Sequence, residues 1–478
     1  MVDTPEESAS RPVFNRLTRG DLKRAWYGLK NIARLTFGVP NGSALRDEKR
    51  GNIKEAIAEC IYAKGGDASA RSRTLELGTI YLNLSKEGRD VFHHILAHDF
   101  DTDREEVAAR FRAWEAAEIP GARIEAEIHL KDALIPPRTL LLKKFSSLPS
   151  GLKFLIDMRA ELLPKTKDDP LLYKLSLDIR EILSAWFDVG LLDLREITWD
   201  SPAALLEKLI EYEAVHKIDS WTDLRKRLSS DRLCFAFFHN KMPTEPLIFV
   251  EVALVDRLSS NITELLHKED ASPEGGKMTT AIFYSITNTQ PGLIGIHLGD
   301  FLIKKVVEKL SVEGSSLKRF ATLSPVPGFR KWLDPILKNG ERTLLTESEQ
   351  DAIRARFPCD NSSTQLYEIL AGPWRQEPET AALVKPILLR LCGRYLLQER
   401  RGERAMDPVA HFHLNNGARL ERINWLADES RNGMERAYGM MVNYNYRLAD
   451  IEKNHEAYAT KGKAAAAREI SALAKKRQ

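Results

Sequence analysis

The stretch Thr279–Phe329 constrains the fold of this chain more than any other part of the sequence. Two apolar runs, Thr280–Ile286 and Arg319–Val326, have the residue types of β-strands. Between them, apolar residues recur at helical spacing over residues 298–310. A strand, a helix and a second strand in this order predict a mixed α/β region.

A turn that contains glycines, residues 292–299, lies between the first of these strands and the helix. The start of a helix offers unpaired N–H groups and a positive dipole end, which suit a phosphate or pyrophosphate. Glycines also let the backbone come close to a ligand. The turn lacks both GxGxxG and GK[ST], so nucleotide hydrolysis is not predicted. From the pattern alone, a structural turn and a ligand-binding turn are both open.

The part of the chain before residue 184 reads almost entirely as helix, and strand-like alternation is nearly absent from it. A length of 478 residues exceeds one ordinary core. The pattern changes to mixed helix and strand after Trp186. We therefore predict a helical bundle over residues 1–183 and a second, catalytic domain over residues 184–478. The helices are expected at Asp21–Phe37, Asn52–Ala63, Arg71–Leu84, Val91–Asp99, Arg104–Ala117 and Leu152–Leu163.

Charge and cysteine content exclude several classes of protein. The net charge is only +3, and basic residues are interspersed with acidic ones, so no nucleic-acid partner is predicted. Four separated cysteines without a CxxC pair exclude a zinc ribbon and fit a reducing compartment. The N-terminus lacks the apolar segment of a secretory signal, and the longest apolar run, Pro246–Val255, is too short to span a membrane. We expect a cytoplasmic protein with no membrane partner.

Histidines and one serine are the candidate chemical groups. His94 and His98 are spaced to share one helix face, as zinc ligands do, but the glutamate of HExxH is missing, so we interpret them as a solvated or packed cluster. His411 and His413 alternate on a segment expected to be extended and would point the same way, yet no third ligand is apparent. Ser324 ends a strand outside any GxSxG motif, so it is a candidate hydrogen-bond donor or proton-transfer group rather than a hydrolase nucleophile.

Several long motifs, in one order, resemble the malonyl-CoA decarboxylase family. They are FYSITNTQPGLIGIHLGDFLIK, TLSPVPGF, DPVAHFHLNNGA, RINWLAD and NYNY, and the resemblance is strongest from Ser184 to Tyr446. It implies a helical domain used in oligomerisation and an acetyltransferase-like (GNAT-type) α/β catalytic domain. It also implies a carboxy-lyase of fatty acid metabolism that converts malonyl-CoA to acetyl-CoA and CO2 without metal or organic cofactor. The implied assembly is a homo-oligomer, a dimer or a tetramer.

The same resemblance implies roles for individual residues. The family's catalytic serine falls on Ser324, its catalytic histidine on His413 and its active-site tyrosine on Tyr446. Animal members carry a glutamate where this chain has His297, so a role for that carboxylate does not carry over. The turn that binds coenzyme A in the family falls on Ile294, Gly295, Ile296, His297, Leu298, Gly299 and Asp300.

The implied chemistry places two demands on the site. Loss of CO2 from a malonyl thioester leaves an enolate, whose oxygen needs hydrogen-bond donors. The α-carbon must then be protonated, which suits a histidine near neutral pH. We expect His413 to donate this proton, Ser324 to bind the malonyl carboxylate or to share the proton transfer, and Tyr446 to hydrogen-bond either of them. A coenzyme A-dependent acyltransferase of the same fold and a non-catalytic acyl-CoA sensor are the alternatives.

Overall fold

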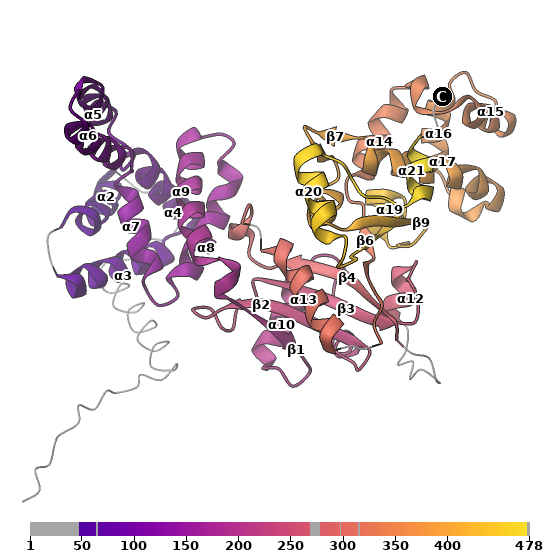
Figure 1. Cartoon of the computed structure of the whole chain (residues 1–478), viewed down its shortest axis with the longest axis horizontal. Helices are drawn as coiled ribbons and strands as arrows, with labels where there is room; N and C mark the ends of the chain where they lie inside the picture. Colours follow the sequence, from indigo (N-terminus) through magenta and orange to yellow (C-terminus); the bar gives the residue numbers. More distant parts are fainter. Residues whose placement is uncertain (1–46, 64–65, 268–277, 297, 314–315, 476–478) are drawn as a thin grey trace, which may run out of the picture. The chain divides into compact units, whose positions relative to one another are not determined.

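The chain forms two compact units, which we describe separately. The structure is a computed structural model that describes residues 47–63, 66–267, 278–296, 298–313 and 316–475 (Figure 1). One unit comprises the chain up to Trp186 together with Pro291–Gly295, and we call it the helical unit. The other comprises Phe187–Gln290 and the chain from Ile296 onward, and we call it the sheet unit.

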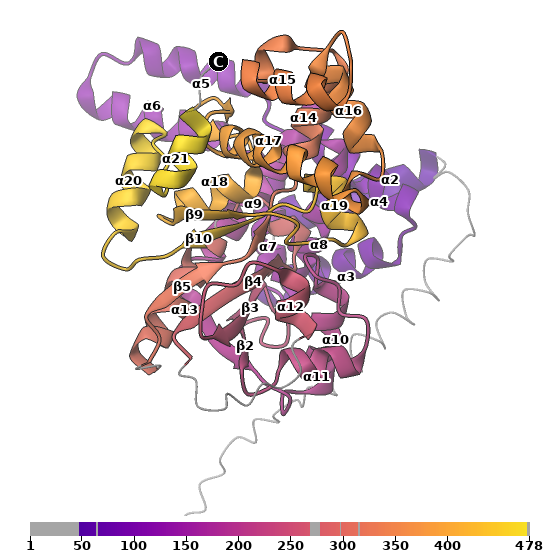
Figure 2. The ribbon, with the colours of Figure 1, turned by 90° about the vertical axis from the view of Figure 1, so that its right-hand side faces the viewer.

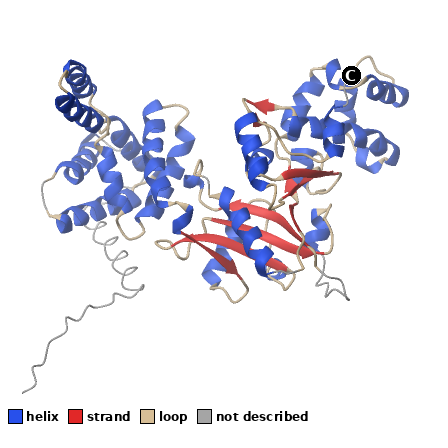
Figure 3. Ribbon diagram, viewed as in Figure 1, coloured by secondary structure: helices blue, strands red, loops and turns tan. Residues whose placement is uncertain are grey.

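The helical unit is built from helices throughout its described residues (Figure 3). Its core contains fully buried Phe92, Leu142, Phe145 and Leu155, which lie on three different helices. The predicted helix Asp21–Phe37 lies outside the described residues. The elements are α2 (Asp47–Tyr62), α3 (Asp67–Asn83), α4 (Lys86–His98), α5 (Arg104–Ala116), α6 (Pro120–Ala133), α7 (Arg138–Ser146), α8 (Gly151–Leu162), η1 (Leu163–Lys165), α9 (Pro170–Trp186) and η3 (Pro291–Leu293).

A mixed β-sheet forms the centre of the sheet unit. Its strand order is β1-β2-β3-β4-β5-β10-β6, and β9 pairs with β10. The pairs β1–β2, β2–β3 and β3–β4 are antiparallel, whereas β4 and β5 run parallel. The strands are β1 (Leu192–Ile197), β2 (Arg232–His239), β3 (Ile248–Val255), β4 (Thr280–Asn288), β5 (Arg319–Thr322), β6 (Ser324–Pro325), β9 (Arg419–Asn424) and β10 (Met441–Asn445).

Helices cover both faces of this sheet. Helices α10 (Ala203–Tyr212) and α11 (Trp221–Arg227) pack on one face in a cluster with apolar side chains of β2 and β3. Helix α13 (Gly299–Glu313) connects the parallel strands β4 and β5, contacts β2 and β3, and lies on the other side of the sheet (Figure 2). The predicted order of a helical region followed by an α/β domain is confirmed.

The rest of the sheet unit is mostly helical, and two predictions about it are wrong. Residues 408–415 are helix α18 rather than an extended segment, because Asp407 caps the helix and Pro408 occupies its first turn. The Ala/Lys-rich composition of residues 455–478 predicts an exposed, frayed helix. Instead, α21 packs on α17 and buries Ile470. The remaining elements are η2 (Val189–Leu191), α12 (Ile262–His267), α14 (Phe329–Lys338), η4 (Arg342–Leu344), α15 (Glu347–Arg356), α16 (Ser362–Ala371), η5 (Trp374–Gln376), α17 (Pro378–Leu397), β7 (Arg400–Arg401), β8 (Arg404–Ala405), α18 (Pro408–Asn415), α19 (Arg431–Ala437), α20 (Ile451–Lys461) and α21 (Arg468–Lys475).

The described residues contain no helix that is both long enough and apolar enough to cross a membrane. All four cysteines have free thiols, and three of them are buried. The core of each unit therefore rests on apolar burial and hydrogen bonds rather than on disulfides.

Candidate active site

Three separate segments of the sheet unit bring Ser324, His413 and Tyr446 together. Ser324 lies in β6, where it pairs with Val442 of β10. Tyr446 follows β10 directly, and its backbone N–H donates to the carbonyl of Phe320 at 2.8 Å. His413 comes from the last turn of α18. The sheet thus fixes the serine and the tyrosine, and the helix supplies the histidine.

A continuous line of hydrogen bonds joins the three side chains. His413 Nε2 lies 2.9 Å from Ser324 Oγ, and His413 Nδ1 lies 2.8 Å from Tyr446 Oη. Ser324 Oγ donates in turn to Thr322 Oγ1 at 2.9 Å. All of these distances are those of good hydrogen bonds. The imidazole therefore bridges a phenol and an aliphatic hydroxyl.

The direction of these bonds follows from the charge of His413. Its ring is 1% exposed, and burial lowers its pKa to about 3, so it is neutral at neutral pH. A neutral imidazole carries one N–H. Because Ser324 donates its own proton to Thr322, the serine accepts from His413 Nε2–H. Nδ1 is then an acceptor, and Tyr446 O–H donates to it. We predicted from the sequence that His413 would titrate near neutral pH. That prediction differs from the structure, in which burial lowers the pKa of this histidine.

Asp407 holds the histidine helix in place. Its Oδ1 accepts from the backbone N–H groups of Val409 and Ala410 and so caps α18. Its Oδ2 accepts from the Gly328 N–H at 3.3 Å, which links the helix to the turn after Ser324. Burial raises the pKa of this carboxyl, and the backbone hydrogen bonds act in the opposite sense. The capping role of Asp407 was not predicted from the sequence, although Asp followed by Pro is a helix-start signal.

Glycine is required at two turns around this site. At Gly417, just after α18, φ is +76°, and a Cβ would lie 2.1 Å from the carbonyl oxygen of Ile451. At Gly328 a Cβ would lie 2.1 Å from the hydroxyl of Tyr395. A larger residue at either position would move α18 or the serine turn away from its neighbours.

Thr322 and Tyr444 contact the site residues and were not predicted from the sequence, whereas Asn416 is the C-cap of α18. Thr322 Oγ1 accepts from both Ser324 Oγ and the Tyr444 N–H. The Tyr444 ring stacks on His413 with centroids 4.5 Å apart. The hydroxyl of Tyr444 and the Nδ2 of Asn416 are buried polar atoms without a hydrogen-bond partner among the described residues. Such atoms are costly in a core, so they are candidate contacts for a substrate.

His411 does not point with His413, contrary to the extended-segment prediction. The two residues are separated by two positions on a helix and therefore face different directions. His411 Nδ1 lies 3.0 Å from the hydroxyl of Tyr458 on α20. The structure therefore gives no support to a metal site that uses both histidines.

The predicted coenzyme A turn is divided between the two units. Ile294 and Gly295 belong to the helical unit, whereas Ile296 and Leu298 belong to the sheet unit, where Gly299 and Asp300 begin α13. Gly295 has a φ of +83°, which favours glycine. His297 lies outside the described residues.

An arginine of α8 fixes the first part of this turn within the helical unit. Arg159 is 3% exposed and donates to the carbonyl of Gly292 and, at 2.8 Å, to that of Ile294. Gly292 itself lies so close to α8 that a Cβ would come within 1.9 Å of the Ile156 carbonyl oxygen. The backbone entering the predicted ligand turn is therefore firmly positioned.

Comparisons with known proteins identify the family of this chain. Residues 190–478 match the family model of the malonyl-CoA decarboxylase C-terminal domain, and residues 100–187 match that of the N-terminal domain. A mitochondrial malonyl-CoA decarboxylase from Anser anser anser is 39% identical over 383 residues, which cover 76% of this chain and 75% of that protein. A mitochondrial malonyl-CoA decarboxylase from Mus musculus is 36% identical over 87% of this chain and 84% of its own length.

Solved structures give the same result. The crystal structure of malonyl-CoA decarboxylase from Rhodopseudomonas palustris is 40% identical, with a TM-score of 0.78, and covers 88% of this chain and 98% of that one. The enzyme from Agrobacterium vitis is 38% identical, also with a TM-score of 0.78, and covers 89% of this chain and 100% of that one. The chain therefore belongs to the malonyl-CoA decarboxylase family.

Proposed function

We propose that this protein converts malonyl-CoA to acetyl-CoA and CO2, with the proton for the product delivered through Ser324, His413 and Tyr446. Family membership supports the reaction. One observation supports the residue roles most strongly: His413 lies 2.9 Å from Ser324 Oγ and 2.8 Å from Tyr446 Oη in a buried site. A line of exchangeable protons that ends on a serine hydroxyl suits protonation of a carbanion.

The reaction proceeds in two steps. First the bond between the α-carbon and the carboxylate carbon breaks, CO2 leaves, and the electron pair moves onto the thioester as an enolate. The enolate α-carbon then takes the proton of Ser324 Oγ. The serine regains a proton from His413 Nε2–H, and His413 Nδ1 takes one from Tyr446, which recovers it from water. The net reaction consumes one proton, and the imidazole begins and ends neutral, as its lowered pKa requires. The step moves the imidazole proton from Nε2 to Nδ1, and proton exchange with water restores the Nε2–H tautomer before the next turnover.

The enolate oxygen needs donors that are already in place, because such groups stabilise developing charge without reorganising. Tyr444, whose ring stacks on His413, and Asn416, which ends α18, each carry a buried donor group without a partner among the described residues. The Tyr444 ring stacks on His413, so its hydroxyl is held by the same helix and strand that hold the proton relay. We assign both groups to the thioester oxygen or the malonyl carboxylate.

The coenzyme A portion of the substrate is assigned to the turn Ile294–Asp300. Gly295 has a positive φ, and α13 begins at Gly299. A helix start offers unpaired backbone N–H groups of the kind that bind phosphates. The two hydrogen bonds from Arg159 to the preceding carbonyls support a turn whose shape is set before the substrate binds.

We further propose that the reaction needs neither metal nor organic cofactor, since the relay accounts for the proton transfer with protein groups alone.

The protein is proposed to act in the cytoplasm and to assemble as a homo-oligomer, a dimer or tetramer, through its helical unit. Light scattering of the purified chain tests the assembly, and a monomeric mass at working concentration would contradict it. Fractionation of cells that express the tagged chain tests the location.

The deciding experiment measures CO2 and acetyl-CoA from malonyl-CoA after the protein has been treated with a chelator. We expect equal amounts of both products, with kcat lowered at least about tenfold in Ser324→Ala and His413→Asn, or about 1.4 kcal/mol in the barrier. The matched control is His411→Asn, because His411 lies on the same helix and also bonds a tyrosine hydroxyl. Transfer of an acetyl group to an amine without CO2 would favour an acyltransferase, and binding without turnover would favour a sensor.

A further inference from the structure

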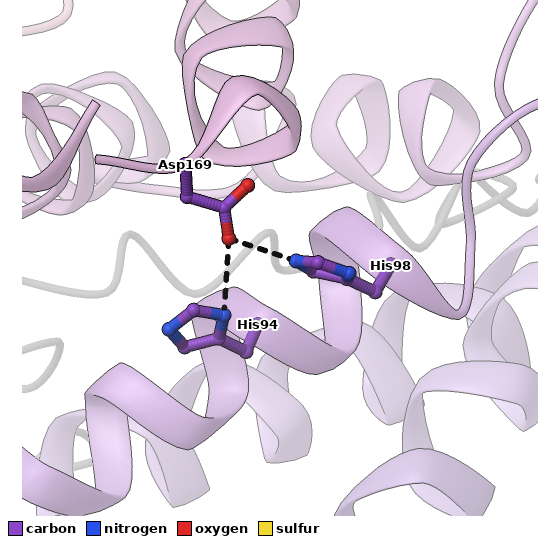
Figure 4. Close-up of side chains that lie close together, drawn as sticks. All are labelled: His94, His98 and Asp169. Carbon is purple, nitrogen blue, oxygen red and sulfur yellow. Dashed lines mark hydrogen bonds and ion pairs between the residues drawn. The ribbon is translucent and has the colours of Figure 1, made fainter. Parts of the chain in front are cut away.

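Two histidines and one aspartate gather on the surface of the helical unit. His94 and His98 lie one turn apart near the end of α4, with ring centroids 5.5 Å apart. Asp169 precedes α9 and reaches across to both rings (Figure 4). Asp169 lies 71 positions from His98 in the sequence, so spacing alone did not reveal it as a third ligand.

The distances among these atoms are close to those of a metal-binding triad. Asp169 Oδ2 lies 2.9 Å from His98 Nε2 and 3.5 Å from His94 Nδ1. One ligand atom from each residue lies within 4.8 Å of the other two. Ligands about 2.0–2.1 Å from a tetrahedral zinc ion lie roughly 3.3–3.4 Å from one another. Small rotations of the two imidazoles would therefore bring all three atoms to one ion.

The aspartate is held in the orientation that such a site needs. Its Oδ1 accepts from the backbone N–H groups of Leu171 and Leu172, at 2.8 and 3.3 Å, so it caps α9. This leaves Oδ2 directed at the histidines (Figure 4). A carboxylate fixed through one oxygen binds metal through the other with less loss of conformational entropy.

The residue types and their exposure indicate the kind of ion. Two imidazoles and one carboxylate favour zinc and the neighbouring late transition metals over Mg²⁺ and Ca²⁺, which prefer oxygen ligands. The His94 and His98 side chains are 50% and 43% exposed, so a water can occupy a fourth position.

We propose that His94, His98 and Asp169 bind one divalent transition-metal ion, with Zn²⁺ the best match, and that the ion ties the end of α4 to the start of α9. The site is separate from the proposed decarboxylation chemistry, whose residues lie in the sheet unit. Its role is structural, since binding to the folded state alone stabilises that state.

The test is titration of the full-length, chelator-treated protein with ZnCl2 by calorimetry and with CoCl2 by visible absorption. We expect one ion per chain, and a tetrahedral Co²⁺ spectrum. His98→Gln and Asp169→Asn should each weaken binding at least about tenfold, or 1.4 kcal/mol. Asp169→Asn retains an oxygen that can cap α9, so it separates metal binding from helix capping. His129→Gln, which changes an exposed histidine of α6, is the matched control and should bind like the wild type.

A second measurement does not depend on the cobalt spectrum. Zn²⁺ should raise the thermal unfolding midpoint of the wild type and of His129→Gln, and have no such effect on His98→Gln. Equal Co²⁺ spectra and affinities in the wild type and both ligand variants would overturn the proposal. An equal Zn²⁺ shift in His98→Gln would do so as well. Neither measurement involves catalysis, so the outcome is independent of the decarboxylase proposal.

Discussion

Replacement of Tyr446 by Phe tests the direction of the proton relay. The change removes the hydroxyl that lies 2.8 Å from His413 Nδ1 and keeps the ring, which meets the imidazole edge-on. The Tyr446 hydroxyl favours the His413 tautomer that carries its proton on Nε2, because it donates to Nδ1. Without it, that tautomer loses its stabilisation, and the Nε2–H group is the one that faces Ser324. The expected result is therefore a slower proton transfer with the site otherwise intact.

The magnitude follows from burial. A buried polar atom left without its partner costs about 1–3 kcal/mol. If that cost falls on the productive tautomer, kcat decreases roughly 5- to 150-fold, because each 1.36 kcal/mol is about tenfold in rate. KM for malonyl-CoA should change less, since Tyr446 is assigned to proton transfer and not to coenzyme A binding.

The assay is steady-state CO2 release from malonyl-CoA, with circular dichroism to show that the variant is folded. Tyr458→Phe is the matched control, because the Tyr458 hydroxyl lies 3.0 Å from Nδ1 of His411 on the same helix. Its kcat should stay within about twofold of the wild type, or about 0.4 kcal/mol. A folded Tyr446→Phe variant with wild-type kcat would refute the relay, as would an equal loss in the control.

Three further predictions test the surroundings of the site. Asp407→Asn leaves the Gly328 N–H without a carboxylate acceptor. It should lower kcat and reduce the free energy of unfolding in urea by about 1–3 kcal/mol. A variant with unchanged kcat and stability would contradict the positioning role of Asp407. Arg159→Lys keeps the charge but loses the forked donor, so it should raise KM for malonyl-CoA more than it lowers kcat in steady-state assays; a pure kcat effect would count against the turn assignment. Burial lowers the pKa of His93 to about 4, so its unfolded state takes up a proton first as pH falls below about 6.5, and stability decreases from there toward pH 4 by up to about 1.4 kcal/mol per pH unit. His93→Gln should reduce this slope in urea unfolding at several pH values, and an identical slope would show that His93 is not the group responsible.

The sequence predicted the overall order of elements because that order depends on local patterns. Apolar spacing located β4 and α13 to within a few residues. The motifs located Ser324, His413 and Tyr446, and the structure places their side chains in hydrogen-bond contact. The motifs identify the three residues. The contact between their side chains depends on the pairing of β6 with β10 and on the packing of α18.

Features that depend on tertiary contacts were not predictable in this way. Helix α18 is only eight residues long, so its apolar periodicity is too short to separate it from a strand. The lowered pKa of His413 arises from burial, which no local pattern reports. Asp169 meets His94 and His98 only because α4 and α9 lie side by side. The docking of α21 on α17 likewise depends on a partner distant in the sequence.

The central claim is that Ser324 and His413 act as one proton-transfer unit, and a double-mutant cycle on kcat tests it most directly. Ser324→Ala, His413→Asn and the double variant would be compared with the wild type in malonyl-CoA decarboxylation. Residues that act as a unit are strongly non-additive. We predict that the double variant is about as slow as the slower single variant. Losses that multiply in the double variant would contradict the shared relay and would assign the two residues to separate steps.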